Sequence, residues 1–224
     1  TWANEQNIPP LLAHFGTSLL ERAAIDAFCR HHNRPFHQLL RENTFGIDWS
    51  LNEPRLAGVD WLSLLPKEPL SEATVRHTVG MVDKLRDSDI SPEERLDDGL
   101  PQSLEACIRT YGLREFKLKL SGDAEADLDR LSDIAAVITE RAPADFRFSL
   151  DANEQFTSPD QLRAFGKMVN SDSHLKPFFN HLAFIEQPLS RKVALSPDQP
   201  DIRSCWPDPV ALLIDESDGG WDDL

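Results

Sequence analysis

The stretch Phe116-Lys117-Leu118-Lys119-Leu120 alternates apolar and charged residues with a period of two. In a β-strand, this period places the apolar residues on one face and both lysines on the other. Taken alone, such a segment is more typical of an edge strand whose lysine face is in contact with water. In a closed parallel sheet the lysine face points inward instead, and both ammonium groups then approach the site at the end of the sheet.

Acidic residues end three other apolar runs. Asp151 follows residues 146–150, Glu186 follows residues 182–185, and Asp215 follows residues 210–214. A carboxylate at the end of a buried strand is costly unless positive charge meets it. Active sites of parallel α/β proteins lie at the carboxyl ends of the strands. The sequence therefore predicts that these carboxylates share one divalent cation, Mg²⁺ with Mn²⁺ as the alternative, because both ions take oxygen ligands.

The three acids and two lysines also have simpler explanations. Any one of the acids, considered alone, is more often a helix cap or an ion-pair partner, and only their corresponding positions favour a shared site.

Adjacent positive charge and partial burial both lower the pKa of a lysine, so a neutral amine can act as a base near neutral pH. Proton transfer by Lys117 and Lys119 beside the cation is therefore the predicted chemistry.

The order of elements along the chain predicts an α/β fold. A helix is expected over 17–33, and the proline-containing residues 41–74 are expected to be a long connection. Strands are predicted at 75–82, 114–120, 145–151, 182–186 and 210–215, with helices at 104–111, after Asp123 and after Ser158. This alternation predicts parallel strands with right-handed crossovers. A (β/α)8 barrel of the TIM type uses about 31 residues per unit, so the chain from Val75 onward has room for about five units of a partial barrel.

Composition excludes several classes of partner. The 224 residues include 38 acidic and 23 basic ones, which gives a net charge of −15, so neither nucleic acid nor an anionic membrane is an expected partner. No apolar stretch approaches the roughly 20 residues that span a bilayer, and the first ten residues lack the features of a signal peptide. Three widely separated cysteines fit free thiols in a reducing compartment, and a cytoplasmic location is expected.

Four short motifs occur in an order that is found in a known group of enzymes. They are Lys117-Leu118-Lys119, Asp151-Ala152-Asn153, Glu186-Gln187-Pro188 and Asp215-Glu216-Ser217. Together they resemble the enolase superfamily, and within it the mandelate racemase/muconate lactonizing enzyme family, in its muconate cycloisomerase and o-succinylbenzoate synthase branch. Residues 19–26 and 35–40 also resemble the segments that precede that family's barrel. The resemblance covers nearly the whole chain and is poorest over 41–74.

The resemblance implies a metal-dependent isomerase or lyase. Such an enzyme removes a proton α to the carboxylate of a small substrate through an enediolate intermediate, as in cycloisomerisation, syn-dehydration or epimerisation. The implied Mg²⁺ ligands are Asp151, Glu186 and Asp215. The implied acid/base is Lys119, with Lys117 as its neighbour. Asn153 and Glu216 would contact the ligands and orient them. Residues 1–74 would be the end of an α+β capping domain and its connection, and residues 75–224 a partial barrel.

Departures from the family pattern leave other interpretations open. Segments 170–181 and 191–209 are longer than is usual, and the lysine that this branch carries on its sixth barrel strand has no counterpart. The chain as given is therefore expected to be incomplete as an enzyme. The alternative is a non-catalytic barrel relative, or a truncated fragment, with a structural or binding role. A third interpretation is an ordinary (β/α) protein whose acids are helix caps, and a homo-oligomer is compatible with each.

Overall fold

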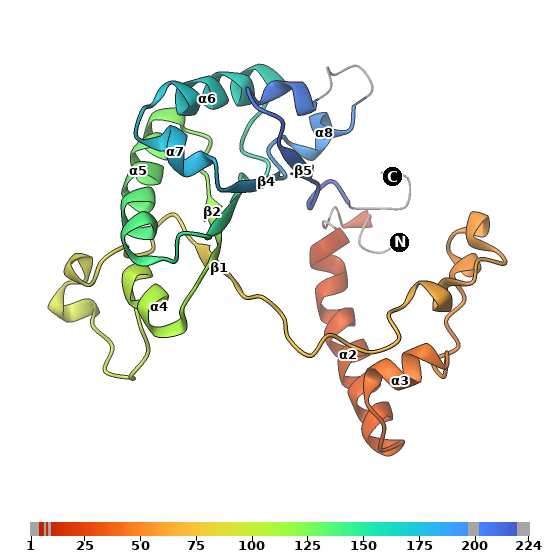
Figure 1. The fold of residues 1–224 in the computed structure, drawn as a ribbon. Coiled ribbons are helices and arrows are strands. Elements are labelled where there is room, and N and C mark those ends of the chain that lie inside the picture. The colour runs from red at the N-terminus through yellow and green to blue at the C-terminus, as the bar shows by residue number, and fades with distance from the viewer. Residues whose placement is uncertain (1–4, 7, 9, 197–201, 219–224) are drawn as a thin grey trace. The chain divides into compact units, whose positions relative to one another are not determined.

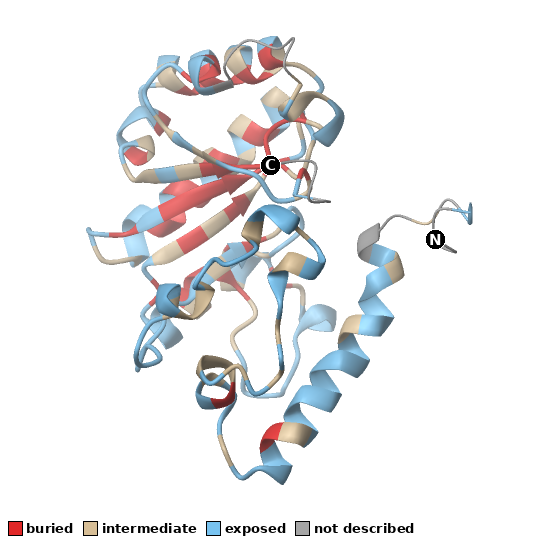
Figure 2. Cartoon of the chain, turned by 90° about the vertical axis from the view of Figure 1, so that its right-hand side faces the viewer, coloured by how far each residue is buried: buried red, intermediate tan, exposed pale blue. Residues whose placement is uncertain are grey.

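The computed structural model describes residues 5–6, 8, 10–196 and 202–218 (Figure 1). The chain forms two compact units, the first ending at Ala73 and the second running from Thr74 to Asp218. Figure 2 shows that the long helix α2 of the first unit is exposed along most of its length, whereas the second unit carries buried residues on both its strands and its helices.

The first unit is built from helices and turns. Helix α2 spans Pro10–His31, so it starts earlier than the predicted 17–33 and ends two residues sooner. Proline is well tolerated in a first helical turn, where its missing N–H is not needed. Helix α3 spans Phe36–Arg41 and follows Pro35, which is in an extended conformation. The predicted connection after α3 contains the short 3₁₀ helices η1 (Trp49–Leu51), η2 (Pro54–Leu56) and η3 (Trp61–Leu64).

The second unit contains a parallel sheet. Its strands are β1 (Arg76–Val79), β2 (Glu115–Lys119), β3 (Arg147–Asp151), β4 (Leu182–Glu186) and β5 (Ala211–Leu213). The strands lie in chain order and every neighbouring pair is parallel, which confirms the predicted α/β class. Within the described residues β1 and β5 are the outer strands, and the sheet does not close on itself.

The predicted outer strands were too long. Strand β1 stops at Val79 because the next residue turns: the Gly80 N–H donates to the Asp83 carboxylate at 2.7 Å. Strand β5 stops at Leu213, and the Asp215 N–H donates to the Gln187 side chain instead of continuing the strand ladder. Both ends are therefore decided by side-chain acceptors that compete with the sheet for backbone donors.

Two helices begin at the predicted residues Asp123 and Ser158, and the helix predicted at 104–111 is capped by Ser103. Ser103, Asp123 and Ser158 each accept a hydrogen bond from a backbone N–H in the first turn of the following helix. The helices are α4 (Leu104–Tyr111), α5 (Ala124–Arg141), α6 (Pro159–Ser171), α7 (Leu175–Phe179) and α8 (Arg191–Ala194), with the 3₁₀ helices η4 (Asp87–Asp89), η5 (Pro92–Glu94) and η6 (Ile202–Cys205). Gly112 ends α4 in the left-handed conformation, with φ of 61°, so this helix has its predicted bounds.

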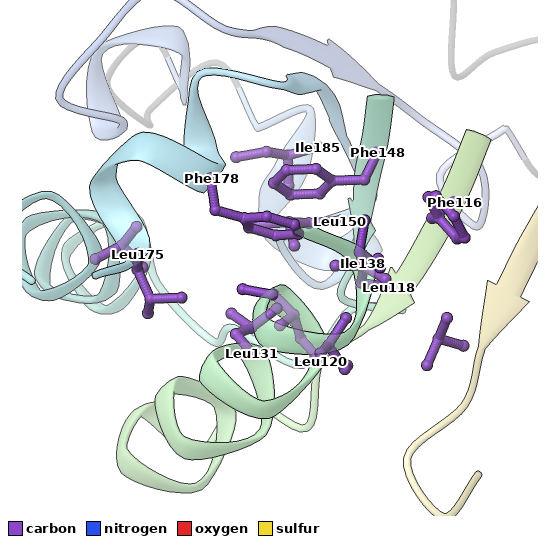
Figure 3. Packing of buried hydrophobic residues seen from close by; sticks show 14 of the residues in the cluster. Phe116, Leu118, Leu120, Leu131, Ile138, Phe148, Leu150, Leu175, Phe178 and Ile185 are labelled. Carbon is purple, nitrogen blue, oxygen red and sulfur yellow. The ribbon is translucent and has the colours of Figure 1, made fainter. Parts of the chain in front are cut away.

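The core lies between the sheet and its helices. Phe116 and Leu118 of β2 and Phe148 and Leu150 of β3 are buried on the face that meets α5 and α7 (Figure 3). The Phe148 ring stacks on Phe178 of α7 with a centroid distance of 4.3 Å. This apolar face fixes the register of the strands, and the register in turn decides which residues lie on the opposite face and at the carboxyl ends.

Candidate active site at the carboxyl edge of the sheet

Strand β2 presents its lysines to the face away from the helices. Phe116 and Leu118 are completely buried among the core residues, and Lys117 and Lys119 alternate with them. The lysine side chains are still only 18% and 27% exposed. The predicted alternation is therefore confirmed, and the lysine face is not a freely solvated one.

Acidic residues end the next two strands beside these lysines. Asp151 is the last residue of β3 and Glu186 the last of β4. The sheet register pairs Lys119 with Asp151 and Asp151 with Glu186, so the three side chains share one face at one level. Asp151 is fully buried and Glu186 is 4% exposed. Carboxylates so far from water need positive partners.

The ammonium groups supply those partners. Lys117 Nζ lies 2.7 Å from Asp151 Oδ2 and 2.6 Å from Glu186 Oε1, so it bridges the two carboxylates. Lys119 Nζ lies 2.6 Å from the same Asp151 oxygen. We call Lys117, Lys119, Asp151 and Glu186 the lysine–carboxylate cluster. The sequence predicts these residues at one site, and the structure brings them into direct contact.

Asn153 and Glu216 extend the cluster toward the last segment of the sheet. Lys119 Nζ donates to Asn153 Oδ1, and Asn153 Nδ2 donates to Glu216 Oε1 at 2.8 Å. An ammonium can only donate and a carboxylate can only accept, so these partners fix which way the amide of Asn153 faces. Both residues are predicted to orient the ligands. In the structure Asn153 contacts the cluster directly, and Glu216 contacts Asn153.

Asp215 does not join the cluster. It lies beyond the end of β5, it is exposed, and its carboxylate makes no hydrogen bond or ion pair with the described residues. The expectation that Asp215 ends its strand as Asp151 and Glu186 do is wrong. In the described ranges no group of three or more His, Cys, Asp or Glu side chains is arranged to hold a metal ion. The structure thus assembles two of the three predicted ligands.

Two carboxylate oxygens at this edge nevertheless have the chemistry of ligands for a hard cation. Glu186 Oε2 and Glu216 Oε2 are both buried, and neither has a hydrogen-bond partner among the described residues. Arg76 Nη2 of β1 is 3.7 Å from Glu186 Oε2, within ion-pair range but too far for a hydrogen bond. Buried oxygens without donors are exceptional in proteins, and carboxylate oxygens are the ligands that Mg²⁺ prefers. A bound cation would satisfy these two oxygens, but the described residues do not gather three acidic side chains around one point.

The pKa of Lys117 moves opposite to the expected direction. Burial by itself would lower this pKa, but hydrogen bonds to Asp151 and Glu186 outweigh burial and raise it above the usual value. The prediction of a lowered pKa is therefore wrong for Lys117 in this structure, because two anions are its nearest neighbours. Burial would likewise raise the pKa of Asp151, but hydrogen bonds from Lys117 and Lys119 lower it.

In the sequence, Gln187 is recognisable only as part of the Glu186-Gln187-Pro188 motif, and its contacts are not predicted. Gln187 is 1% exposed, and its side chain bonds the Asp215 and Ser217 backbone. The available signal was an amide directly after Glu186, within a segment from Leu182 to Leu189 that is apolar at its other positions. Arg76 was missed as well, since a lone arginine at the start of a strand is usually a surface residue; here its guanidinium carbon lies 5.0 Å from the Phe184 ring centroid.

A cavity of about 690 Å³ lies away from this site. Its lining includes Ala135 and Thr139 of α5, Leu175 and Phe178 of α7, and His181. His181 immediately precedes β4, so this cavity is at the amino edge of the sheet. Function in parallel α/β proteins is concentrated at the carboxyl edge, and the lysine–carboxylate cluster is there.

In comparisons with known proteins, no family model and no curated sequence matches this chain. Among the described residues, no helix combines the length and the apolar character that crossing a membrane requires.

Proposed function

We propose that this chain belongs to a Mg²⁺-dependent enzyme of the enolase superfamily, which removes a proton α to the carboxylate of a small substrate. The observation that carries the proposal is the lysine–carboxylate cluster: two lysines of one strand meet the terminal carboxylates of the next two strands at one edge of a parallel sheet. This arrangement combines a proton-transferring amine with anionic oxygens at the edge where parallel sheets hold their active sites.

The contacts divide the roles of the lysines. Lys119 is the more exposed of the two and pairs with one carboxylate, Asp151, and with the amide of Asn153. Lys117 bridges Asp151 and Glu186, and this fixes its position more tightly. We assign Lys119 as the acid/base that takes and returns the α-proton. Lys117 is its neighbour, which adds positive charge for the substrate carboxylate.

Asp151, Glu186 and Asp215 are the residues that would hold Mg²⁺. The ion, when bound, supplies positive charge that stabilises the negative charge developing on the substrate carboxylate as the proton leaves. Asn153 and Glu216 orient Lys119 through their hydrogen bonds. The five parallel strands with their helices support a partial (β/α) barrel as the framework, with residues 1–74 as the end of a capping domain. This chemistry needs neither nucleic acid nor a membrane, and it fits a cytoplasmic enzyme.

Exchange of substrate α-protons with deuterated solvent tests the proposal. The complete gene product would be incubated in D₂O with a panel of small carboxylates, with Mg²⁺ or with a chelator, and deuterium incorporation would be followed by NMR. We expect exchange that requires Mg²⁺ and that falls by roughly 10²–10⁴-fold in Lys119→Met. The matched control is Lys84→Met, because Lys84 pairs with Glu94 in a loop away from the cluster. Exchange that persists in the chelator or in Lys119→Met would refute the assignment.

One observation favours the second candidate, a non-catalytic barrel relative with a binding or structural role. Lys117 and Lys119 already pair with Asp151 and Glu186, so the cluster is largely neutral without any cation. For such a protein, calorimetric titration with Mg²⁺ gives no saturable binding and no carboxylate of the panel exchanges its α-proton. Saturable Mg²⁺ binding together with exchange excludes this candidate.

A further inference from the structure

The cavity at the amino edge of the sheet has the size and the walls of a small-molecule site. Its volume is about 690 Å³, and all its lining residues belong to the second unit. Ligand sites in proteins have volumes of roughly 300–1,000 Å³ and mostly apolar walls. Phe146, Leu175 and Phe178 are buried and supply apolar surface here. None of the lining residues belongs to the lysine–carboxylate cluster, so this cavity is separate from the site of the proposed function.

Helix α5 leaves room for a ligand because it presents small side chains to the cavity. They recur at spacings of three and four residues and so share one face of the helix. These residues are Ser132, Ala135, Ala136 and Thr139. Aromatic surface lines the same cavity, where the His181 ring stacks on the Phe146 ring with a centroid distance of 4.1 Å. A flat ring is therefore the shape that these walls fit.

The hydrogen bond of His181 sets the role of its other ring nitrogen. Nδ1 lies 2.9 Å from the Phe146 carbonyl oxygen. A carbonyl can only accept, so Nδ1 carries the proton, and in the neutral ring Nε2 is then an acceptor. Nε2 makes no hydrogen bond with the described residues. His181 therefore gives the cavity a ring of fixed orientation and an acceptor for an N–H donor.

The carboxylates at the cavity give it a preference for positive charge. Glu140 and Asp172 are in the lining, and no described lysine or arginine is. Glu140 is already paired with Arg86 and Arg141, each at 3.1 Å. Asp172 is therefore the carboxylate that remains for a ligand.

The contacts of Asp172 leave one of its oxygens available. Oδ1 accepts from the backbone N–H groups of His174 and Leu175, at 2.8 and 3.0 Å. Oδ2 makes no hydrogen bond with the described residues. The bonds from Leu175 and His174 lower the pKa of Asp172, so its carboxylate is ionised at neutral pH.

We propose that this cavity binds a small aromatic amine, with the ring against the small face of α5 and the Phe146–His181 stack, and the ammonium group at Asp172 Oδ2. The apolar and aromatic walls require the ring, and the carboxylate selects a cation over an anion. A ring N–H, as in an indole, can also donate to His181 Nε2. The proposal is independent of the proposed function at the opposite edge of the sheet.

Tryptamine is the probe that tests the proposal. It would be titrated into the isotope-labelled complete gene product and followed by NMR. Saturable shifts are expected at the Ala136 methyl group and the His181 ring, with a Kd of about 1 mM or tighter. Indole-3-propionate carries the same ring with the opposite charge and should bind at least roughly tenfold more weakly. Ethylamine carries the charge without the ring, so it reports the general attraction of cations to a chain of net charge −15 and should give no saturable shift.

Two variants with matched controls examine charge and space separately. Asp172→Asn keeps an oxygen that accepts from the backbone but removes the charge, and it should weaken tryptamine binding by roughly 3–10-fold. Asp133→Asn removes a charge from an exposed position of α5 outside the lining and should leave the affinity unchanged. Ala136→Phe fills the cavity from an exposed position of α5 and should abolish binding, whereas Ala126→Phe, exposed on the same helix but outside the lining, should not.

Each outcome decides the proposal. Saturable shifts at cavity-lining residues that weaken in Asp172→Asn and vanish in Ala136→Phe support it. The absence of saturable shifts with tryptamine, shifts centred elsewhere, equal affinity for indole-3-propionate, or wild-type affinity in Asp172→Asn overturns it. If Ala136→Phe does not fold, Thr139→Met narrows the cavity from the next turn of α5, and undiminished binding to that variant overturns the proposal. None of these results alters the proposed function, which deuterium exchange tests separately.

Discussion

The two faces of the β-sheet contrast in how their side chains are stabilised. On the helix face, Phe116, Leu118, Phe148 and Leu150 are buried against α5 and α7, and apolar burial is favourable with almost any well-packed neighbour (Figure 3). On the opposite face, Lys117 and its partners are also largely buried, but each buried charge is tolerated only because a specific opposite charge is within about 3 Å.

This difference separates fold from function. Apolar contacts on the helix face determine the strand register, and the same register then brings Lys119, Asp151 and Glu186 to one level on the other face. The helix face should therefore lose the most stability when it is altered. The charged face should show effects that depend on cations, and the exposed rim should show small effects that depend on pH.

The largest expected effect comes from removing a ring on the helix face. Phe148 is 1% exposed, stacks on Phe178 and meets the edge of Phe179. Phe148→Ala should lower the free energy of unfolding by about 3–5 kcal/mol, because it removes buried surface and leaves a cavity. Urea denaturation followed by circular dichroism measures this loss.

An exposed aromatic residue provides the control for that variant. Tyr111 at the end of α4 is 56% exposed, and Tyr111→Ala should change the free energy of unfolding by only about 0.5 kcal/mol. Equal losses in the two variants would show that the helix face of the sheet is not the dominant source of stability.

A smaller effect is expected on the charged face. Among the described residues, Lys117→Met leaves Glu186 with Arg76, at 3.7 Å, as its ion-pair partner, while Asp151 keeps Lys119. The loss of hydrogen bonds to two buried carboxylates should cost about 2 kcal/mol without metal. Because the variant also removes a competing positive charge, Mg²⁺ should bind it more tightly and restore more stability than in the wild type.

Thermal unfolding with and without Mg²⁺ measures both parts of this prediction. Lys119→Met is the matched variant, because Lys119 contacts only one carboxylate of the cluster and Asp151 then still keeps Lys117. It should lose less stability than Lys117→Met. If Lys117→Met is as stable as the wild type in the absence of Mg²⁺, the charged face does not depend on its bridging lysine.

The sequence predicted the elements whose pattern is local. The alternation of Phe116 to Leu120 was sufficient for β2, and Asp123 and Ser158 were sufficient to locate the starts of α5 and α6. In the same way, a carboxylate that directly follows an apolar run is predicted to end a strand, and this is correct for Asp151 and Glu186.

The failures have a different physical origin. The position of Asp215 depends on Gln187, a residue 28 positions away, whose side chain takes the Asp215 N–H out of the strand ladder. No local pattern encodes that bond. The same holds for the pKa of Lys117, which is raised by carboxylates from two other strands. Contacts between distant segments decide both features.

The smallest expected effect is at the rim of the carboxyl edge. Arg191 of α8 bonds both carboxylate oxygens of Glu154, at 2.9 and 2.7 Å, and the two side chains are 49% and 23% exposed. This hydrogen-bonded pair chiefly lowers the pKa of Glu154. Arg191→Ala should therefore cost roughly 0.5–1 kcal/mol near neutral pH, the range of partly exposed ion pairs.

The pH dependence of that cost follows from its sign. A carboxyl group whose pKa is lower in the folded state stabilises the protein above its unfolded pKa, about 4.3 for glutamate, and loses this contribution as the pH falls through the folded value. The difference between wild type and Arg191→Ala should be constant above about pH 5 and vanish in acid. Arg114→Ala removes the more exposed pair with Asp145 at the amino edge and should change stability very little near neutral pH. A difference for Arg191→Ala that grows as the pH falls would contradict the assignment of Glu154 as its partner, because protonation can only weaken that pair.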